Sequence, residues 1–355
     1  MSGTQVVPEG AGATHPADRL REAASRYGLI VVLAAMPAYL AISDLTTYGD
    51  LSRLGNNLVA GLSNGAIYAL IALGYTLVYG IIELINFAHG EVFMIGSFVA
   101  FGLWGTFGLG LATGPLGLVV GLFATLLITM VVCGVMNVMI EQVAYKPLRS
   151  APKLAPLITA VGFSFILQNV GILWLGSSPA SVPDLIHAQA DVLTLFGVTV
   201  HRADVLALAV TVPLVLALTT FVTRSRLGKA MRATAQDPEA ARLMGVNINT
   251  TISLTFLLGG ALAGAAGLVN LLYQTNVWYF QGFSAGLIAF TAAVMGGIGN
   301  LRGAVLGGLI IGCIQQISDY RIGADWTVAV VFAYLILIMV FRPQGLIGEA
   351  TREAG

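Results

Sequence analysis

The chain has 355 residues, of which 57% are hydrophobic and 10% are charged, and its mean hydropathy is +0.87. A soluble domain carries about 25% charged residues, so this composition excludes a soluble protein and indicates an integral membrane protein. Basic and acidic residues balance at 17 each, and the few histidines and acidic residues form no recognisable catalytic set. We therefore expect neither an enzyme nor a nucleic-acid partner.

Apolar segments follow one another along the chain and are judged against the roughly 20 residues that a transmembrane helix needs. They cover 27–43, 55–80, 90–108, 114–140, 154–176, 204–222, 250–272, 284–298, 303–318 and 326–341. The segments 284–298 and 303–318 are short and rich in glycine, so they are either full crossings or re-entrant helices. The pattern predicts an all-α, polytopic membrane helix bundle with about 8–10 transmembrane helices.

The N-terminal residues 1–26 are polar and rich in Gly, Pro and Ala, which is typical of a disordered extension. The segment 27–43 contains Pro37 and ends in a sequence, Ala-Ile-Ser, that can be misread as a signal-peptide cleavage site. Basic residues before it suit both a retained first span, which we favour, and a removed or interfacial segment. Residues 27–348 are expected to form one membrane domain, followed by a tail at 349–355.

The distribution of basic residues predicts the orientation, because Lys and Arg accumulate in cytoplasmic loops. If the N-terminus is inside and all ten segments cross, the inner side receives 14 basic residues and the outer side receives Arg53, Arg202 and Arg321. Both termini and the polar stretch 224–249 are therefore expected on the cytoplasmic side.

The stretch 224–249 carries the signals of a short helix between two spans. Asp237 suits an N-cap, Pro238 suits the first helical position because it lacks an N–H, and Gly245 suits a left-handed exit. The helix should have about two turns.

One face of this helix is apolar. Ala240, Leu243 and Met244 share it at i, i+3, i+4 spacing, while Glu239 and Arg242 are spaced to pair on another face. An apolar face on a polar loop needs a partner, so the sequence predicts a docking element.

Polar residues at membrane depth are candidates for a transport pathway, because each must be satisfied or face water. The candidates are Asn64, Tyr68, Asn86, His89 and Glu91. Residues 83–91 either interrupt a helix and line a route, or form a cytoplasmic turn that places Glu91 near a helix start. An interhelical hydrogen bond is an equally good interpretation of Asn64 and Tyr68.

The apolar segments also carry small residues at four-residue spacing, a pattern that favours close helix packing over a pathway role. The pairs are Gly260 with Gly264, Ala263 with Gly267, Gly303 with Gly307, and Gly308 with Gly312. The two cysteines, Cys133 and Cys313, lie in apolar runs without metal-ligand spacing. We expect them to be packing residues, with no disulfide and no metal site.

Four motifs carry a family resemblance. They are Gly61–Gly80 (GLSNGAIYALIALGYTLVYG), Ile85–Glu91 (INFAHGE), Glu141–Arg149 (EQVAYKPLR) and Ala289–Gly299 (AFTAAVMGGIG). Over residues 54–348 the chain resembles the permease subunits of bacterial ABC importers for branched-chain amino acids, specifically the first of the two homologous permeases of the high-affinity Leu/Ile/Val system. The first 50 residues depart from the shorter family pattern.

The resemblance implies a role for the short helix: a Glu-Ala-Ala, three residues, Gly element that docks on an ATPase subunit. The implied coupling residues are Asp237, Pro238, Glu239, Ala240, Ala241, Leu243, Met244 and Gly245. It further implies two ATP-binding subunits, a second homologous or identical permease, a periplasmic substrate-binding protein and a place in the inner membrane. The only Gly-Lys, at 228–229, lacks a phosphate-loop context, so ATP and Mg are expected on partner chains and no cofactor on this one.

Other transport classes are weighed against this one. An ion-coupled secondary transporter needs ionisable groups near mid-membrane, which the spans almost lack. A passive channel for a small neutral solute needs no docking helix. Permeases for urea, short amides or other amino acids within the ABC class are not excluded by the residues.

Overall fold

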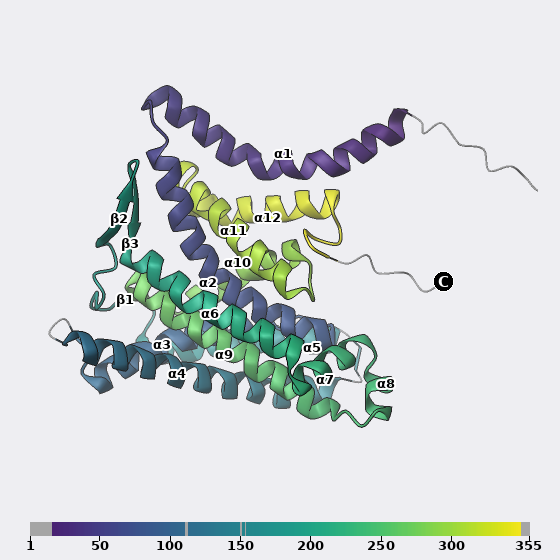
Figure 1. Cartoon of the computed structure of the whole chain (residues 1–355). Helices are drawn as coiled ribbons and strands as arrows, with labels where there is room; N and C mark the ends of the chain where they lie inside the picture. The colour runs from purple at the N-terminus through teal and green to yellow at the C-terminus, as the bar shows by residue number, and fades with distance from the viewer. Residues whose placement is uncertain (1–15, 111–112, 150, 153, 349–355) are drawn as a thin grey trace, which may run out of the picture.

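The computed structural model describes residues 16–110, 113–149, 151–152 and 154–348, and the helices run between two ends of the molecule (Figure 1). The helices are α1 (Pro16–Thr47), α2 (Ser52–Ile82), α3 (His89–Phe107), α4 (Pro115–Ile140), α5 (Leu154–Leu175), α6 (Arg202–Arg224), α7 (Arg226–Gln236), α8 (Pro238–Leu243), α9 (Ile248–Gln274), α10 (Gln281–Gly296), α11 (Leu301–Arg321) and α12 (Ala324–Phe341). A π-helical turn (Glu141–Tyr145) and a 3₁₀ turn (Lys146–Leu148) extend α4. The strands are β1 (Ala180–Ser181), β2 (Asp191–Leu195), β3 (Val198–His201) and β4 (Asn276–Val277).

Eight of the described helices are long and apolar enough to cross a membrane, by length and composition: α2, α3, α4, α5, α6, α9, α11 and α12. This confirms the predicted all-α, polytopic bundle. The short α7 and α8 project together at one end of the bundle, which we call the α8 end, and the β2–β3 hairpin lies at the other, which we call the hairpin end (Figure 1).

The helix α10 has 16 residues, but it still runs from one end of the bundle to the other. At its start, the preceding strand β4 pairs with β1 at the hairpin end. At its finish, Met295 accepts a 2.8 Å hydrogen bond from the amide of Leu346, beyond α12. The next helix, α11, returns to the hairpin end, where Arg321 contacts Asp44. The helix α11 is long and apolar enough to cross a membrane, whereas α10 is shorter, and whether α10 is a full crossing, a half-length helix or a re-entrant one stays a prediction.

The predicted small-residue pairs pack helix against helix. A side chain at Gly260 or Gly264 would overlap the backbone of α4, and one at Gly308 would overlap α2. Gly303 and Gly307 lie in the same way against α10. These contacts confirm the packing interpretation, because only a missing Cβ lets two backbones approach so closely. Cys133 is a buried free thiol and Cys313 a partly buried one, so both contribute to packing.

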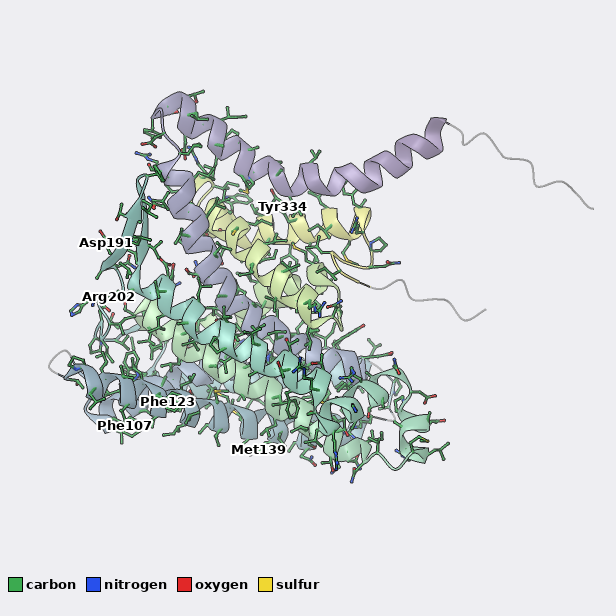
Figure 2. All side chains as sticks on the ribbon, viewed as in Figure 1. Phe107, Phe123, Met139, Asp191, Arg202 and Tyr334 are labelled. Atoms are coloured by element: carbon green, nitrogen blue, oxygen red, sulfur yellow. The ribbon has the colours of Figure 1, made fainter. Side chains whose placement is uncertain are left out.

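The bundle has a buried centre and an apolar outer surface. Helices α2 and α9 are largely enclosed, whereas α4, α5, α6 and α12 expose most of their apolar side chains. Figure 2 places Phe123 and Met139 along the outer side of α4, where they are 60% and 61% exposed. Such a surface suits contact with lipid.

The helix α1 corrects one expectation. Residues 16–26, predicted to be disordered, form its beginning, because this segment is rich in the helix formers Ala, Leu, Arg and Glu. Residues 1–15 and 349–355 lie outside the described part of the chain. The helix continues through Pro37 to Thr47 and lies beside α12 (Figure 1). Whether it is a retained span stays a prediction.

Candidate functional site

The helix α8 has the predicted start and stop. Asp237 caps it by accepting hydrogen bonds from the amides of Glu239 (2.9 Å) and Ala240 (3.0 Å). Gly245 has φ +84°, a left-handed conformation that strains any residue with a side chain, and its amide bonds back to Arg242. The helix proper has six residues, Pro238–Leu243. Six residues make about two turns, as predicted.

The apolar face of α8 points away from the bundle. Leu243 is 89% exposed and Met244 is 85% exposed, whereas Ala241 is buried against the neighbouring helices. The expected ion pair between Glu239 and Arg242 does not form, although the structure describes both residues. Two large apolar side chains on a capped, polar helix form a small surface suited to a partner groove.

A second helix, α7 (Arg226–Gln236), holds α8 in place and was not foreseen in the polar stretch. Ser225 caps it through a 2.8 Å hydrogen bond from Gly228, and the guanidinium of Arg232 bonds to the carbonyl of Val222 on α6. The sequence signal was present in the serine before a run of helix formers. Because α7 is anchored to α6, α8 is presented on a firm support.

A buried polar network ties the α4–α5 connection to the start of α9, close to α8. Glu141 is fully buried and forms an ion pair with Arg149, whose side chain is 24% exposed. Arg149 also donates to Asn249 at 2.7 Å, and Glu141 accepts from Ser253 (2.8 Å) and Gln142 (2.7 Å). Sequence reasoning noted this motif only as a family match. Its structural role depends on partners that are 100 and 112 positions away.

The interruption is a short connection between α2, which ends at Ile82, and α3, which begins at His89. Asn86 is buried and donates to Asn137 (3.1 Å) while it accepts from the hydroxyl of Tyr145 (3.2 Å). Asn137 in turn donates to the carbonyl of Phe256 at 2.7 Å. Asn86 therefore joins α4 and α9 to the turn, and a pathway role for it stays a prediction.

Two ionisable residues begin α3 and are fully buried, His89 and Glu91. The ring of His89 packs edge-on against Tyr75, with centroids 4.9 Å apart. One oxygen of Glu91 accepts from Ser164 (3.0 Å) and Gln168 (2.9 Å) of α5. Its other oxygen, Oε2, has no hydrogen-bond partner.

The candidate pathway residues do not form one group. Asn64 donates to Gln316 of α11 at 3.1 Å, which agrees with the interhelical hydrogen bond considered for it. Tyr68, one turn further along α2, packs against the hydrophobic core and is partly buried. Glu91 lies instead between α3 and α5. Among the described residues, no cluster of three or more His, Cys, Asp or Glu side chains is placed to hold a metal ion.

Long apolar helices with buried polar groups between them, and a short exposed helix at one end, indicate a multi-pass membrane protein. Comparison with known families agrees with this class. The family description "Branched-chain amino acid transport system / permease component" matches residues 57–340, and the chain belongs to this family.

Individual relatives match over most of their length. The high-affinity branched-chain amino acid transport system permease protein BraD of Pseudomonas aeruginosa is 42% identical over 299 residues, covering 83% of this chain and 96% of the relative. The corresponding LivH of Escherichia coli strain K12 is 40% identical over 296 residues, covering 82% and 95%. A probable LivH of Methanocaldococcus jannaschii is 28% identical over 318 residues, covering 84% and 94%.

Proposed function

We propose that this chain is a permease subunit of an ATP-driven importer in the bacterial inner membrane, and that it passes leucine, isoleucine and valine into the cytoplasm. The names of the relatives support this substrate class. ATP and Mg bind to two partner ATPase subunits, a second permease lies alongside, and a substrate-binding protein delivers the amino acid from outside. This chain forms the route through the membrane, and the partner ATPase subunits drive its conformational change.

The observation that carries the proposal is the exposed apolar pair of α8, Leu243 and Met244, on a helix capped at both ends. An ATPase subunit with an apolar groove would cover this pair and grip the helix. Because α7 anchors α8 to α6, a push on α8 reaches a membrane helix directly. This is a route by which closure of the ATPases changes the arrangement of the bundle.

The position of α8 also supports an orientation of the chain in the membrane. The helix α1 begins and α12 ends at the α8 end (Figure 1), and the basic residues predicted to be cytoplasmic include those of α7. We propose that both termini, α7 and α8 face the cytoplasm.

The hairpin end is then the face for the binding protein. Strands β2 and β3 meet in a two-residue turn in which Phe196 and Gly197 both have positive φ, and the Phe196 side chain is 100% exposed. Figure 2 shows Asp191 and Arg202 at the same end. An aromatic anchor with charged neighbours is suited to a protein partner.

The test is uptake of radiolabelled leucine by proteoliposomes that contain this permease, its ATPases, the second permease and the binding protein. The double variant Leu243→Ser/Met244→Ser should lower ATP-dependent uptake by about tenfold or more, since loss of two buried apolar anchors weakens docking by well over 1.4 kcal/mol. Membrane insertion and thermal stability should not change, because both side chains are solvent-exposed in the isolated chain.

Leu227→Ser is the matched control, since Leu227 is also an exposed leucine at the α8 end, 48% exposed on α7. It should leave uptake nearly unchanged. Normal uptake by the Leu243/Met244 variant would refute the docking assignment. ATP-dependent uptake of urea in preference to leucine by the unaltered complex would refute the substrate class.

A further inference from the structure

A cavity lies beside Glu91, within the membrane-spanning part of the bundle. Its volume in this arrangement of the helices is about 40 Å³, room for a few water molecules, so a larger solute enters it only when the surrounding helices move apart. Its lining is almost wholly apolar and aromatic: Tyr75, Phe87, Val161, Phe165, Gly282, Phe283, Gly286, Leu287 and Phe290, with Ser164 as the one aliphatic hydroxyl. Contributions come from α2, the connection between α2 and α3, α5 and α10, so the cavity lies where these elements meet.

The carboxylate of Glu91 lies directly behind this wall. Its Oε1 is held by Ser164, which lines the cavity, and by Gln168 one turn further along α5. Its Oε2 faces Gly282, another lining residue, and a Cβ at that position would overlap the oxygen. The absence of a side chain at Gly282 therefore leaves Oε2 separated from the cavity by backbone alone.

Among the described residues, Glu91 and Asp44 are buried acids with one free oxygen, but Asp44 has a cationic partner in Arg321 and Glu91 has none. Glu141, which is equally buried, has both oxygens bonded, by Arg149 on one side and Ser253 on the other. Glu91 has no basic partner within ion-pair distance in the described part of the chain, and Oε2 has no hydrogen-bond donor. A buried carboxylate without a cation is costly in lipid surroundings, so a cationic donor that reached Oε2 would stabilise it.

The chemistry of the site selects that partner. An unpaired carboxylate oxygen accepts from a cationic N–H donor, and nearby faces of Tyr75, Phe87 and Phe290 also favour a cation. The apolar remainder of the lining, such as Val161 and Leu287, suits an aliphatic chain. A molecule with both features is an amino acid with a branched hydrocarbon side chain.

We propose that Glu91 and this aromatic cavity form a transit site, in which Oε2 accepts a hydrogen bond from the α-ammonium group of the passing amino acid while its aliphatic side chain lies against the phenylalanines. This inference rests on the proposed function and names the point of substrate contact inside the permease. Ser164 and Gln168 act as positioning residues that hold the carboxylate toward Gly282.

The first experiment is Glu91→Gln in the complete reconstituted importer. The amide keeps the shape and can still accept from Ser164 and Gln168, but it places an N–H where Oε2 stood. Leucine uptake should fall by about tenfold or more, as expected for loss of one charge-assisted hydrogen bond. ATPase stimulation by the loaded binding protein should stay within about twofold of the unaltered complex, because docking does not involve this site.

Ser97→Ala is the matched control. Ser97 is also a buried polar residue of α3, and it donates to the carbonyl of Gly267 at 2.9 Å, away from the cavity. This variant should leave uptake within about twofold, since removing one neutral interhelical hydrogen bond in a membrane protein has a small effect. If the two variants reduce uptake equally, Glu91 is only a packing residue and the inference fails.

A second readout does not depend on transport. In a chain with Cys133→Ala and Cys313→Ala, Phe290→Cys places a single thiol in the cavity wall. A cationic methanethiosulfonate reagent should modify it several-fold faster than an anionic one, because the reagent meets the Glu91 carboxylate. Adding Glu91→Gln should remove that preference, while the same change should not alter the rate ratio of a thiol at Leu227→Cys.

The outcomes separate the two proposals. A rate ratio that Glu91→Gln leaves unchanged overturns the transit site and does not affect the importer assignment. Failure of the unaltered complex to take up leucine overturns the importer assignment, whereas the thiol measurement still reports on the charge beside the cavity.

Discussion

An ion pair lies at each end of the bundle, and the two pairs differ in how fully their carboxylates are bonded. At the α8 end, Glu141 is completely buried against Arg149, which is 24% exposed. At the hairpin end, Asp44 is completely buried against Arg321, which is 27% exposed. Every oxygen of Glu141 has a partner, whereas Oδ2 of Asp44 has none.

The two ion pairs also differ in their position relative to the region that the family description matches. Glu141 and Arg149 lie inside the part of the chain that the family description matches, residues 57–340, and Asp44 lies before it. The Glu141–Arg149 pair joins the connection between α4 and α5 to α9, near α8. The second joins α1 to the end of α11. A fully bonded pair thus lies within the region that the family description matches, and a half-bonded pair fastens α1, which precedes that region.

The largest effect is expected from Arg149→Met, which leaves the Glu141 charge buried and unpaired. The free energy of unfolding should fall by about 3–5 kcal/mol, and leucine uptake should be lost with it. Thermal unfolding of the purified chain and uptake in proteoliposomes measure the two effects. The double change Glu141→Gln/Arg149→Met removes both charges and should recover most of the stability. No recovery would mean that Arg149 acts through packing and not through its charge.

A smaller effect is expected from Arg321→Met. Because the main contacts of α1 with the described helices are those to α12, α2 and α11, loss of the Asp44 partner should free α1 locally, at a cost of about 1–3 kcal/mol for the unpaired group, and should leave the rest of the bundle folded. Limited proteolysis between α1 and α2 should become faster, while the main thermal transition and leucine uptake stay close to those of the unaltered protein. If Arg321→Met lowers the temperature of the main thermal transition as much as Arg149→Met does, the two ion pairs contribute equally to the stability of the bundle and the comparison fails.

The smallest effect is expected between the two ends, at Asn64→Ala. This change removes a neutral hydrogen bond from α2 to Gln316 of α11, a type of contact that contributes about 0.6 kcal/mol in membrane proteins. Thermal unfolding should shift only slightly, and uptake should stay normal. A loss of uptake without a loss of stability would place Asn64 on the pathway, as the alternative interpretation holds.

Much of the fold was predictable because its signals are local. Apolar length identified the spans, and the caps of α8 identified its start at Asp237 and its left-handed exit at Gly245. The short helix α7 and the β2–β3 hairpin were missed. Both are short elements whose propensities are weak until the rest of the molecule supports them.

The site was less predictable because its contacts join distant parts of the chain. Glu91 was identified as a polar residue at membrane depth, but its partners, Ser164 and Gln168, are 73 and 77 positions away. The same pattern grouped Asn64 with Glu91, although the first bonds to α11 and the second to α5. Residue type shows that a buried polar group needs a partner, and only the packing of the helices shows which one.

Where α2 packs against α11, four glycines bring the two main chains into direct contact. Gly61 and Gly65 of α2 meet the backbone of α11, and Gly308 and Gly312 meet that of α2, so that a methyl group at any of these positions would collide with the opposite main chain. Side chains can change rotamers as helices slide, but two main chains in direct contact have no such adjustable layer. These two helices should consequently move as one rigid body through the transport cycle. The distance between two spectroscopic labels, one on each helix, should stay constant and would provide a reference for measuring the movements of α5 and α12.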